Sequence, residues 1–185
     1  MITIRNYQTK DKGNLRKICL ETSSYPIDTE EQKKFLFLLY NDYYTEVEPE
    51  NCFVAADEND EAVGYIICAE NFKEYSKIFT KFYLPEIKKI SISHYLTAVA
   101  EMTGHRVFSK KYPAHLHIDI LPQCQGQGVG TQLIIALKKH LKSKGINSVM
   151  LSCGLNNTGA IKFYGKNNFK VIMKIAGSCI MASEF

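Results

Sequence analysis

A glycine-rich stretch at residues 125–131, Gln-Gly-Gln-Gly-Val-Gly-Thr, is the part of the sequence best suited to hold a ligand. Glycines adopt positive φ at little steric cost, so the backbone can turn its N–H groups toward an anion. A helix that begins at Val129 would add the partial positive charge of its N-terminus at the same place. The stretch therefore predicts a cradle for a pyrophosphate, with a purely structural tight turn as the alternative.

Three polar side chains alternate with apolar ones just before that stretch, at His115, His117 and Asp119. Side chains of a strand alternate between its two faces, so these three share one face. A histidine near a carboxylate can accept a proton close to neutral pH. We predict that His117 or Asp119 deprotonates an attacking nucleophile, and a structural face of hydrogen-bonded side chains is the alternative.

Other ligand motifs do not fit the sequence. The glycine-rich stretch lacks the Gly-Lys-Ser/Thr of a Walker loop. A Rossmann fingerprint would lie in the first strand–helix unit, with an acid about 20 residues further on. Here the glycine-rich stretch lies in the second half of the chain, and the first acidic residue after it is Glu184. The six cysteines form no Cys-x-x-Cys pair, so we predict no metal site and reduced, buried thiols in a cytoplasmic protein.

Charge is divided unevenly along the 185 residues, although the formal net charge is only +4. Residues 1–102 have 17 acidic and 12 basic side chains, whereas residues 103–185 have 2 acidic and 11 basic ones. The basic half favours an anionic ligand. Only three basic residues are arginines, and base readout depends on arginine, so a small polyphosphate fits better than nucleic acid. A solvated lysine surface is the alternative.

The hydrophobic pattern predicts a single α/β domain over residues 1–185. No apolar run reaches the roughly 20 residues of a membrane span, and we expect no signal peptide. We expect strands at 2–4, 52–56, 62–68, 114–121, 148–152, 169–176 and 179–183, and helices at 9–22, 29–44, 129–144 and 157–167. Thr29, with Gln32 three residues later, is a predicted helix cap, and Gly145 a predicted helix stop. Residues 71–112 are expected to be a helical insertion, with short helices broken by Pro85 and Gly104.

Two motifs in order resemble the GNAT acetyltransferase family. The family's Gln/Arg-x-x-Gly-x-Gly/Ala matches Gln125, Gly128 and Gly130, directly after the strand over 114–121. Its Asn-x-x-Ala-x-x-x-Tyr is similar to residues 157–164, although the following Gly-Phe is Asn-Phe here. Residues 112–120 also look like the acetyltransferase-like domain of O-GlcNAcases, and this narrower resemblance bears on whether the protein is active. The close resemblance covers residues 113–170.

The resemblance implies a mixed, mostly antiparallel sheet of about six or seven strands, splayed at an acetyl-CoA site and flanked by helices on both faces. It implies an acyltransferase that moves an acetyl group from acetyl-CoA to a primary amine, with Tyr164 protonating the departing thiolate and a backbone N–H near Ile118 polarising the thioester. Acetyl-CoA would be held by Ile118, Ile120, Gln125, Gly126, Gln127, Gly128, Val129, Gly130, Thr131 and Asn157.

The acceptor and the class of protein leave alternatives open. Residues 30–61 contain ten acids and two lysines, and we expect this stretch to attract a cationic amine, unless it is simply a solvated face. The first alternative to an enzyme is a non-catalytic acyl-CoA sensor, which would keep the glycine-rich stretch without needing Tyr164. The second is a nucleic-acid-binding protein, for which binding would depend strongly on salt. A homodimer is compatible with the sequence; a nucleic-acid or membrane partner is not expected.

Overall fold

A computed structural model describes residues 2–175 and 177–185; Met1 and Ala176, the last residue of one expected strand, lie outside the described residues. Seven strands form one sheet in the order β1-β2-β3-β4-β5-β7-β6. The strands are β1 (Thr3–Asn6), β2 (Phe53–Ala56), β3 (Ala62–Ala69), β4 (Ala114–Ile120), β5 (Ser148–Gly154), β6 (Lys170–Ile175) and β7 (Ser178–Glu184). The mixed α/β class and the seven-stranded sheet confirm the expected fold.

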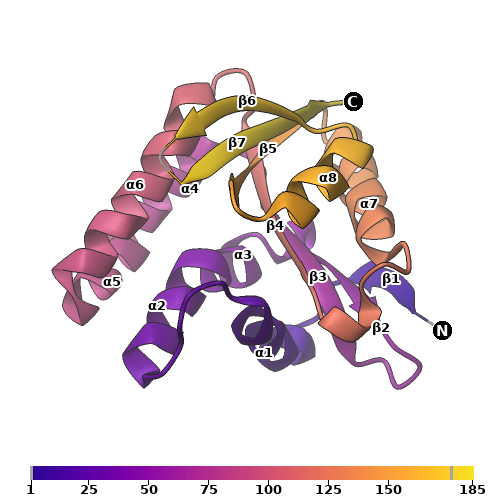
Figure 1. Cartoon of the computed structure of the whole chain (residues 1–185), viewed down its shortest axis with the longest axis horizontal. Coiled ribbons are helices and arrows are strands. Elements are labelled where there is room, and N and C mark those ends of the chain that lie inside the picture. The colour runs from indigo at the N-terminus through magenta and orange to yellow at the C-terminus, as the bar shows by residue number, and fades with distance from the viewer. Residues whose placement is uncertain (1, 176) are drawn as a thin grey trace.

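Helices cover both faces of this sheet (Figure 1). One face is covered by α1 (Lys12–Thr22), α2 (Glu30–Tyr40), α3 (Asp42–Val47), α4 (Phe72–Ile78), α5 (Leu84–Ile90) and α6 (Ile92–Phe108). The other face is covered by α7 (Val129–Ser143) and α8 (Thr158–Lys166). No helix in the described part of the chain is long and apolar enough to span a membrane.

The sheet opens between its two central strands. Strands β3 and β4 pair antiparallel over six residue pairs, from Gly64↔Ile120 to Ala69↔His115. The parallel pairing of β4 with β5 has only two, Ala114↔Val149 and His115↔Met150. Beyond His115, the edge of β4 that faces β5 therefore has no strand partner. A row of backbone donors and acceptors is left open in the middle of the sheet.

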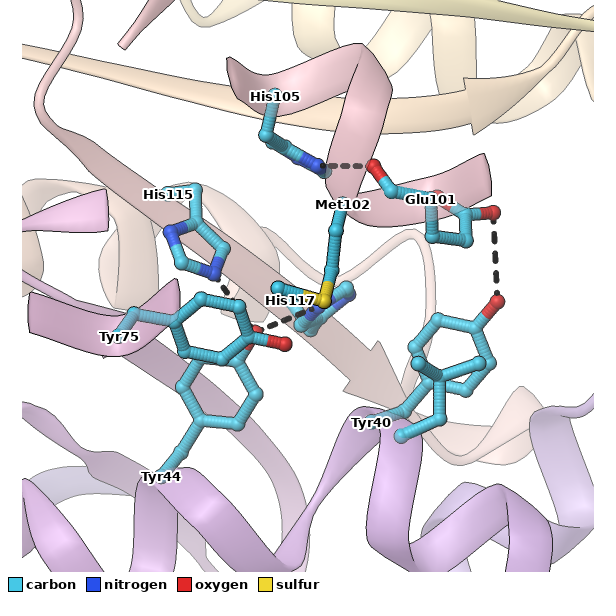
Figure 2. A pocket seen from close by; sticks show the side chains of 9 residues that line it. Tyr40, Tyr44, Tyr75, Glu101, Met102, His105, His115 and His117 are labelled. Carbon is cyan, nitrogen blue, oxygen red and sulfur yellow. Dashed lines mark hydrogen bonds between the residues drawn. The ribbon is translucent and has the colours of Figure 1, made fainter. Parts of the chain in front are cut away.

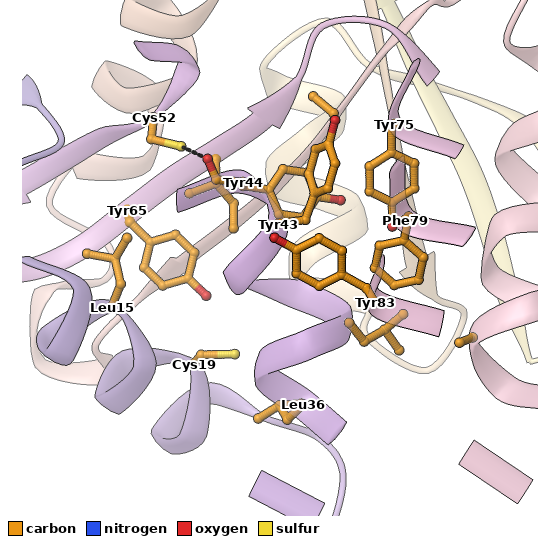
Figure 3. Packing of buried hydrophobic residues seen from close by; sticks show 14 of the residues in the cluster. Leu15, Cys19, Leu36, Tyr43, Tyr44, Cys52, Tyr65, Tyr75, Phe79 and Tyr83 are labelled. Carbon is orange, nitrogen blue, oxygen red and sulfur yellow. Dashed lines mark hydrogen bonds between the residues drawn. The ribbon is translucent and has the colours of Figure 1, made fainter. Parts of the chain in front are cut away.

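The first core is unusually aromatic. Tyr43, Tyr44, Tyr65 and Phe79 are all at most 1% exposed and pack between the sheet and the helices of the first half of the chain (Figure 3). Large aromatic side chains bury much apolar area each, but every buried tyrosine also needs a partner for its hydroxyl. Those partners are polar residues on β4 and, for Tyr43, Glu48 directly after α3, so this core extends into the site described below.

The second core places the glycine-rich stretch. The apolar face of α7 packs on the sheet beside α8, as its hydrophobic spacing predicted. A Cβ on Gly130 would lie 2.8 Å from the Phe163 ring and 3.1 Å from Cδ1 of Ile120. Gly130 is thus required for the close packing of α7 against α8 and β4, whatever the ligand does.

Two of the expected helix boundaries are wrong. The helix expected at 29–44 begins at the Thr29–Gln32 capping box as predicted, but Asn41, with φ −137° and ψ −58°, divides it into α2 and α3. Gly104 does not end a helix, because α6 continues to Phe108. A Cβ on Gly104 would lie 3.3 Å from Cδ1 of Ile180, so the missing Cβ lets α6 approach Ile180 closely. Pro85 lies in the first turn of α5, where its missing N–H costs nothing.

We expect Gly130→Ala to lower the free energy of unfolding by about 1–3 kcal/mol, because the added methyl group overpacks the α7–α8 contact. The matched control is Gly165→Ala on α8, where a Cβ would meet no atom within 4 Å. That variant should keep or slightly raise stability, since alanine favours a helix over glycine. Urea unfolding of both variants is the measurement. Equal stability of the two would contradict the packing role.

Candidate active site

A cavity of about 1020 Å³ occupies the opening between β4 and β5. It extends from the start of α7 across the strand ends to α8, and it is closed on the far side by the end of α1, by α2 and by α6. Its lining includes every β4 residue from Leu116 to Ile120, and from β5 Ser152, Cys153 and Gly154. The unpaired edge of β4 thus faces a space large enough for an extended ligand.

The glycine-rich stretch forms one end of this cavity. Gly128 is the N-cap of α7, with φ +80°, and no side chain caps the helix. Because the first N–H groups of a helix have no partner within it, an uncapped start leaves several donors free for an anion. Gly126, with φ +74°, reaches the left-handed conformation in the same turn. These features fit the pyrophosphate of a nucleotide such as CoA.

Not every residue predicted for this cradle lies in it. Gln125, Gly126, Gly128, Gly130 and Thr131 line the cavity. Gln127 does not, since its side chain is exposed and donates a hydrogen bond to the carbonyl oxygen of Gln123 at 2.9 Å. Val129 is buried in the α7 core, so only its backbone N–H is available to a ligand. Gln125 Nε2 donates to the carbonyl oxygen of Ile120 at 2.8 Å and ties the loop to the end of β4.

Asn157 and Tyr164 line the opposite wall, which α8 forms. Asn157 caps this helix, because its Oδ1 accepts a hydrogen bond from the Ala160 N–H at 3.0 Å. Tyr164 is 9% exposed and packs against Phe163 and Phe169. Burial, with a smaller contribution from the charge of Asp119, raises the pKa of Tyr164. The phenol therefore remains protonated at neutral pH and can donate a hydrogen bond into the cavity.

Asp119 and His117 share one face of β4, as predicted, but each is held by a different tyrosine. Asp119 Oδ2 accepts a hydrogen bond from the Tyr65 hydroxyl at 2.5 Å. Burial raises the pKa of Asp119, and the hydroxyls of Tyr65 and Thr22 offset part of that rise. His117 Nε2 lies 3.0 Å from the Tyr44 hydroxyl, and burial lowers the pKa of His117 to about 3. His117 is thus neutral at pH 7.

Tyr44 also joins His117 to a second buried histidine (Figure 2). Its hydroxyl lies 2.9 Å from Nε2 of His115, which is 2% exposed. A hydroxyl has one proton, so it donates to one imidazole and accepts from the other. Burial lowers the pKa of His115 well below its usual value. The three groups therefore form one neutral chain in which the tautomers of the two histidines are coupled.

A small cavity of about 10 Å³ lies behind this chain, with room for about one water molecule. His105 Nδ1 faces the backbone carbonyl oxygen of Glu101 at 3.1 Å, so that nitrogen is the protonated one. His105 Nε2 and His115 Nδ1 are buried without a hydrogen-bond partner in the described chain. His105 comes from α6, so the insertion contributes directly to the polar interior of the site.

Glu101 is a site residue to which the sequence pattern did not point. It lies on α6, half-buried, and lines both the large and the small cavity. Its Oε1 is 3.5 Å from the Tyr40 hydroxyl, on α2 (Figure 2). One signal was available: Glu101 is the only acid between Glu86 and Asp119, and it directly follows the apolar run at 98–100. An isolated carboxylate on an apolar helix face is unusual, because burial of a charge is costly.

None of the acids in the stretch at 30–61 lines the cavity, although Leu36 and Tyr40 from the same stretch do. Three of these acids instead form ion pairs within the first half of the chain. Arg16 pairs with Asp42 at 2.8 Å, Lys12 with Glu46 at 2.6 Å, and Arg5 with Asp60 at 2.6 Å. Among the described residues, no cluster of three or more His, Cys, Asp or Glu is arranged to hold a metal ion.

Comparison with known proteins agrees with this geometry. The family model described as the acetyltransferase (GNAT) family matches residues 15–169. The chain belongs to the GNAT acetyltransferase family. Membership confirms the resemblance carried by the two motifs and the enzyme class, an acyltransferase. The match includes the helical insertion, so residues 71–112 lie inside the region that the family model spans.

Individual relatives and solved structures differ in how much of the chain they match and in their sequence identity. A mycothiol acetyltransferase of Renibacterium salmoninarum is 31% identical over 84 residues, which are 45% of this chain and only 24% of that protein. The crystal structure of SsHAT superposes with a TM-score of 0.88 and 25% identity, covering 99% of this chain and 98% of that one. The PaiA N-acetyltransferase from Thermoplasma acidophilum in complex with coenzyme A has a TM-score of 0.62 at 18% identity, covers 100% and 99%, and shares the fold.

The buried neutral histidines predict a pH-dependent stability. In the unfolded chain a histidine binds a proton below about pH 6.5, whereas His117 in the folded protein stays neutral down to about pH 3. The stability that its neutral form contributes is complete above pH 6.5 and is lost as the pH falls toward 3. We expect His117→Gln to reduce the slope of unfolding free energy against pH, between pH 6 and 4, by up to about 1.4 kcal/mol per pH unit. Urea unfolding at several pH values measures it; an unchanged slope would contradict the assigned state.

Proposed function

We propose that this protein transfers the acetyl group of acetyl-CoA directly to the nitrogen of a primary amine. One observation carries this proposal: the open edge of β4 and the uncapped, glycine-rich start of α7 face the same cavity. The open edge of β4 suits a ligand with amide groups, which can add to a sheet edge as a strand does. The uncapped start of α7 suits a pyrophosphate. CoA contains both parts, joined in that order.

The residues that would hold CoA follow from this geometry. The free N–H groups at the start of α7, from Gly128 to Thr131, would bind the pyrophosphate, with Gly126 allowing the backbone to approach it. The β4 backbone around Ile118 and Ile120 would pair with the pantetheine amides. Asn157, at the far wall, would contact the pantetheine arm. When bound, acetyl-CoA supplies a thioester, whose carbonyl carbon accepts an amine and whose sulfur leaves.

The chain's own residues would then serve the transfer in three ways. A β4 backbone N–H near Ile118 would donate to the carbonyl oxygen as negative charge develops on it. Tyr164 would donate a hydrogen bond to the leaving sulfur, because its raised pKa keeps the phenol protonated. His117 and Asp119 would line the path by which the amine loses its proton. Because His117 is neutral and hydrogen-bonded to Tyr44, it would relay a proton rather than retain it at neutral pH.

Three narrower expectations stay proposals. Residues 112–120 support the subgroup resembling the acetyltransferase-like domain of O-GlcNAcases by sequence alone. All six cysteines are free, and five of them are buried, which supports a reducing, cytoplasmic setting. A homodimer is supported by nothing beyond its compatibility with the sequence.

The anion cradle can be tested by a pair of substitutions at Gly128. Asn and Asp both tolerate the left-handed conformation that φ +80° requires, and they differ mainly in charge. We expect Gly128→Asp to weaken CoA binding at least about tenfold more than Gly128→Asn, because its carboxylate would repel the pyrophosphate. Isothermal titration calorimetry with CoA measures both. Equal affinities would place the pyrophosphate elsewhere.

The role of Tyr164 separates an enzyme from a CoA sensor. We expect Tyr164→Phe to lower kcat by about 100-fold or more while the Kd for CoA stays within about twofold of the wild-type value. Acetyl-CoA turnover against a panel of primary amines, followed by thiol release, measures the first quantity, and calorimetry the second. A wild-type protein that binds CoA but acetylates no amine would favour the sensor. Full activity of Tyr164→Phe would remove Tyr164 from the mechanism.

A further inference from the structure

Glu101 lies where an acceptor amine would have to enter. The pairing of β4 with β5 ends at His115 and Met150, and the side chains two residues further along each strand are His117 and Ser152. Both line the large cavity together with Glu101. The Ser152 hydroxyl interacts with the Glu101 carboxyl, which is thus placed over the point where the strands separate. That point is on the opposite side of the cavity from α8 and Tyr164.

The Glu101 carboxylate has no cationic partner among the residues that the structure describes. No lysine or arginine lines the large cavity, and none contributes to the electrostatic surroundings of Glu101 in the described chain. Its hydrogen bonds come from hydroxyls only, and the one from Tyr40 is long, at 3.5 Å. An ionised carboxylate can accept about four hydrogen bonds, so most of this capacity is unused. A partly buried carboxylate facing an uncharged wall creates a favourable place for a cation.

The other groups around Glu101 are poorly suited to accept a proton. The two cavities are lined by several other titratable side chains. Around the large cavity these are Cys19, Tyr25, Tyr40, His117, Asp119, Cys153 and Tyr164, and around the small cavity they include His105, His115, Tyr44 and Tyr75. Burial lowers the pKa of all three histidines. Burial raises the pKa of Asp119 as well, but Asp119 already accepts a short hydrogen bond from Tyr65, at 2.5 Å. Burial raises the pKa of Glu101, which makes its carboxylate a better base than an exposed one.

We propose that Glu101 binds the acceptor as an ammonium ion and takes the proton that must leave before the nitrogen can attack. This inference rests on the acetyl transfer proposed above and names the charge state of its acceptor: a primary amine that enters as a cation. The insertion helix α6 therefore supplies the acceptor subsite, whereas β4, α7 and α8 supply the CoA site.

The proton balance is simple. The ammonium N–H proton passes to a Glu101 carboxylate oxygen, giving a neutral amine and a carboxylic acid. The amine nitrogen forms a bond to the thioester carbonyl carbon, the carbon–sulfur bond breaks, and the second nitrogen proton goes to the thiolate. The Glu101 carboxyl then returns its proton to solvent through the open cavity. No metal or redox partner is needed for any of these steps.

A binding experiment tests the subsite without any turnover. NMR titrations of the protein, with and without CoA, would use n-butylammonium as the cationic probe and 1-butanol as its neutral counterpart. We expect wild-type protein to bind n-butylammonium at least about fivefold more tightly than 1-butanol, and Glu101→Gln to abolish that preference. The matched control is Glu74→Gln, which removes an exposed acid from the same insertion, outside both cavities. Equal preference in Glu101→Gln and Glu74→Gln would overturn the proposal.

A kinetic experiment tests the proton transfer. With butylamine, tyramine and cadaverine as probe acceptors, we expect Glu101→Gln to lower kcat/KM by about 100-fold or more. We also expect it to remove the acidic limb of the pH profile, which a merely structural role would leave in place. Glu101→Asp, which keeps the charge but shortens the side chain, should restore part of the rate and the limb. Glu101→Asp also allows the proton transfer to be tested if Glu101→Gln does not fold.

The two proposals fail in different ways. If the wild-type protein binds no CoA, the acetyl-transfer function is wrong, while the n-butylammonium titration of the free protein still decides the role of Glu101. If the protein binds CoA and acetylates a probe amine, but Glu101→Gln keeps kcat/KM within about twofold of Glu74→Gln, the acceptor subsite is wrong and the function stands.

Discussion

The early separation of β4 from β5 is the constraint on which the rest of the structure depends. Backbone N–H and C=O groups away from water require partners, and a sheet that opens after two residue pairs leaves one row of them without a strand. The pairing of β4 with β3 over residues 115–120, and of β5 with β7 over residues 148–154, holds each strand in place on its other edge, so the opening is part of the sheet itself. The aromatic core on one face and α7 with α8 on the other keep the two halves apart.

The two parts of the chain contribute different walls of the cavity. The basic second half provides the open strand edge, the uncapped helix and Tyr164, all suited to an anionic thioester ligand. The first half and the insertion provide tyrosines, His105 and Glu101, which together with His115 and His117 of β4 make a polar wall with no lysine or arginine among its described residues. Gly130 holds the second part together, since its missing Cβ allows α7, α8 and β4 to meet. A cavity with an uncapped, glycine-rich helix start at one end and, at the other, a carboxylate with no cationic partner among the described residues is thus a consequence of the fold.

Much of this was predictable from sequence because the signals are local. Alternation at 114–121, the Thr29 capping box and the glycine turn each depend on neighbours in the chain, and the two family motifs fixed the order of elements. The roles of Tyr44, Tyr65 and Glu101 were not predictable, because they depend on contacts between segments as much as 73 residues apart. The ion pairs of Asp42, Glu46 and Asp60 in the acidic stretch were not predictable for the same reason: their partners are Arg16, Lys12 and Arg5, and only the fold brings them together.

Amide hydrogen exchange of β4, resolved residue by residue by NMR with and without CoA, tests the central claim most directly. On CoA binding, exchange should slow at those amides of residues 116–120 that face β5, and at the start of α7. The amides already bonded to β3 should change little. If the β5-facing amides exchange equally fast with saturating CoA, the open strand edge does not hold the ligand and the account fails.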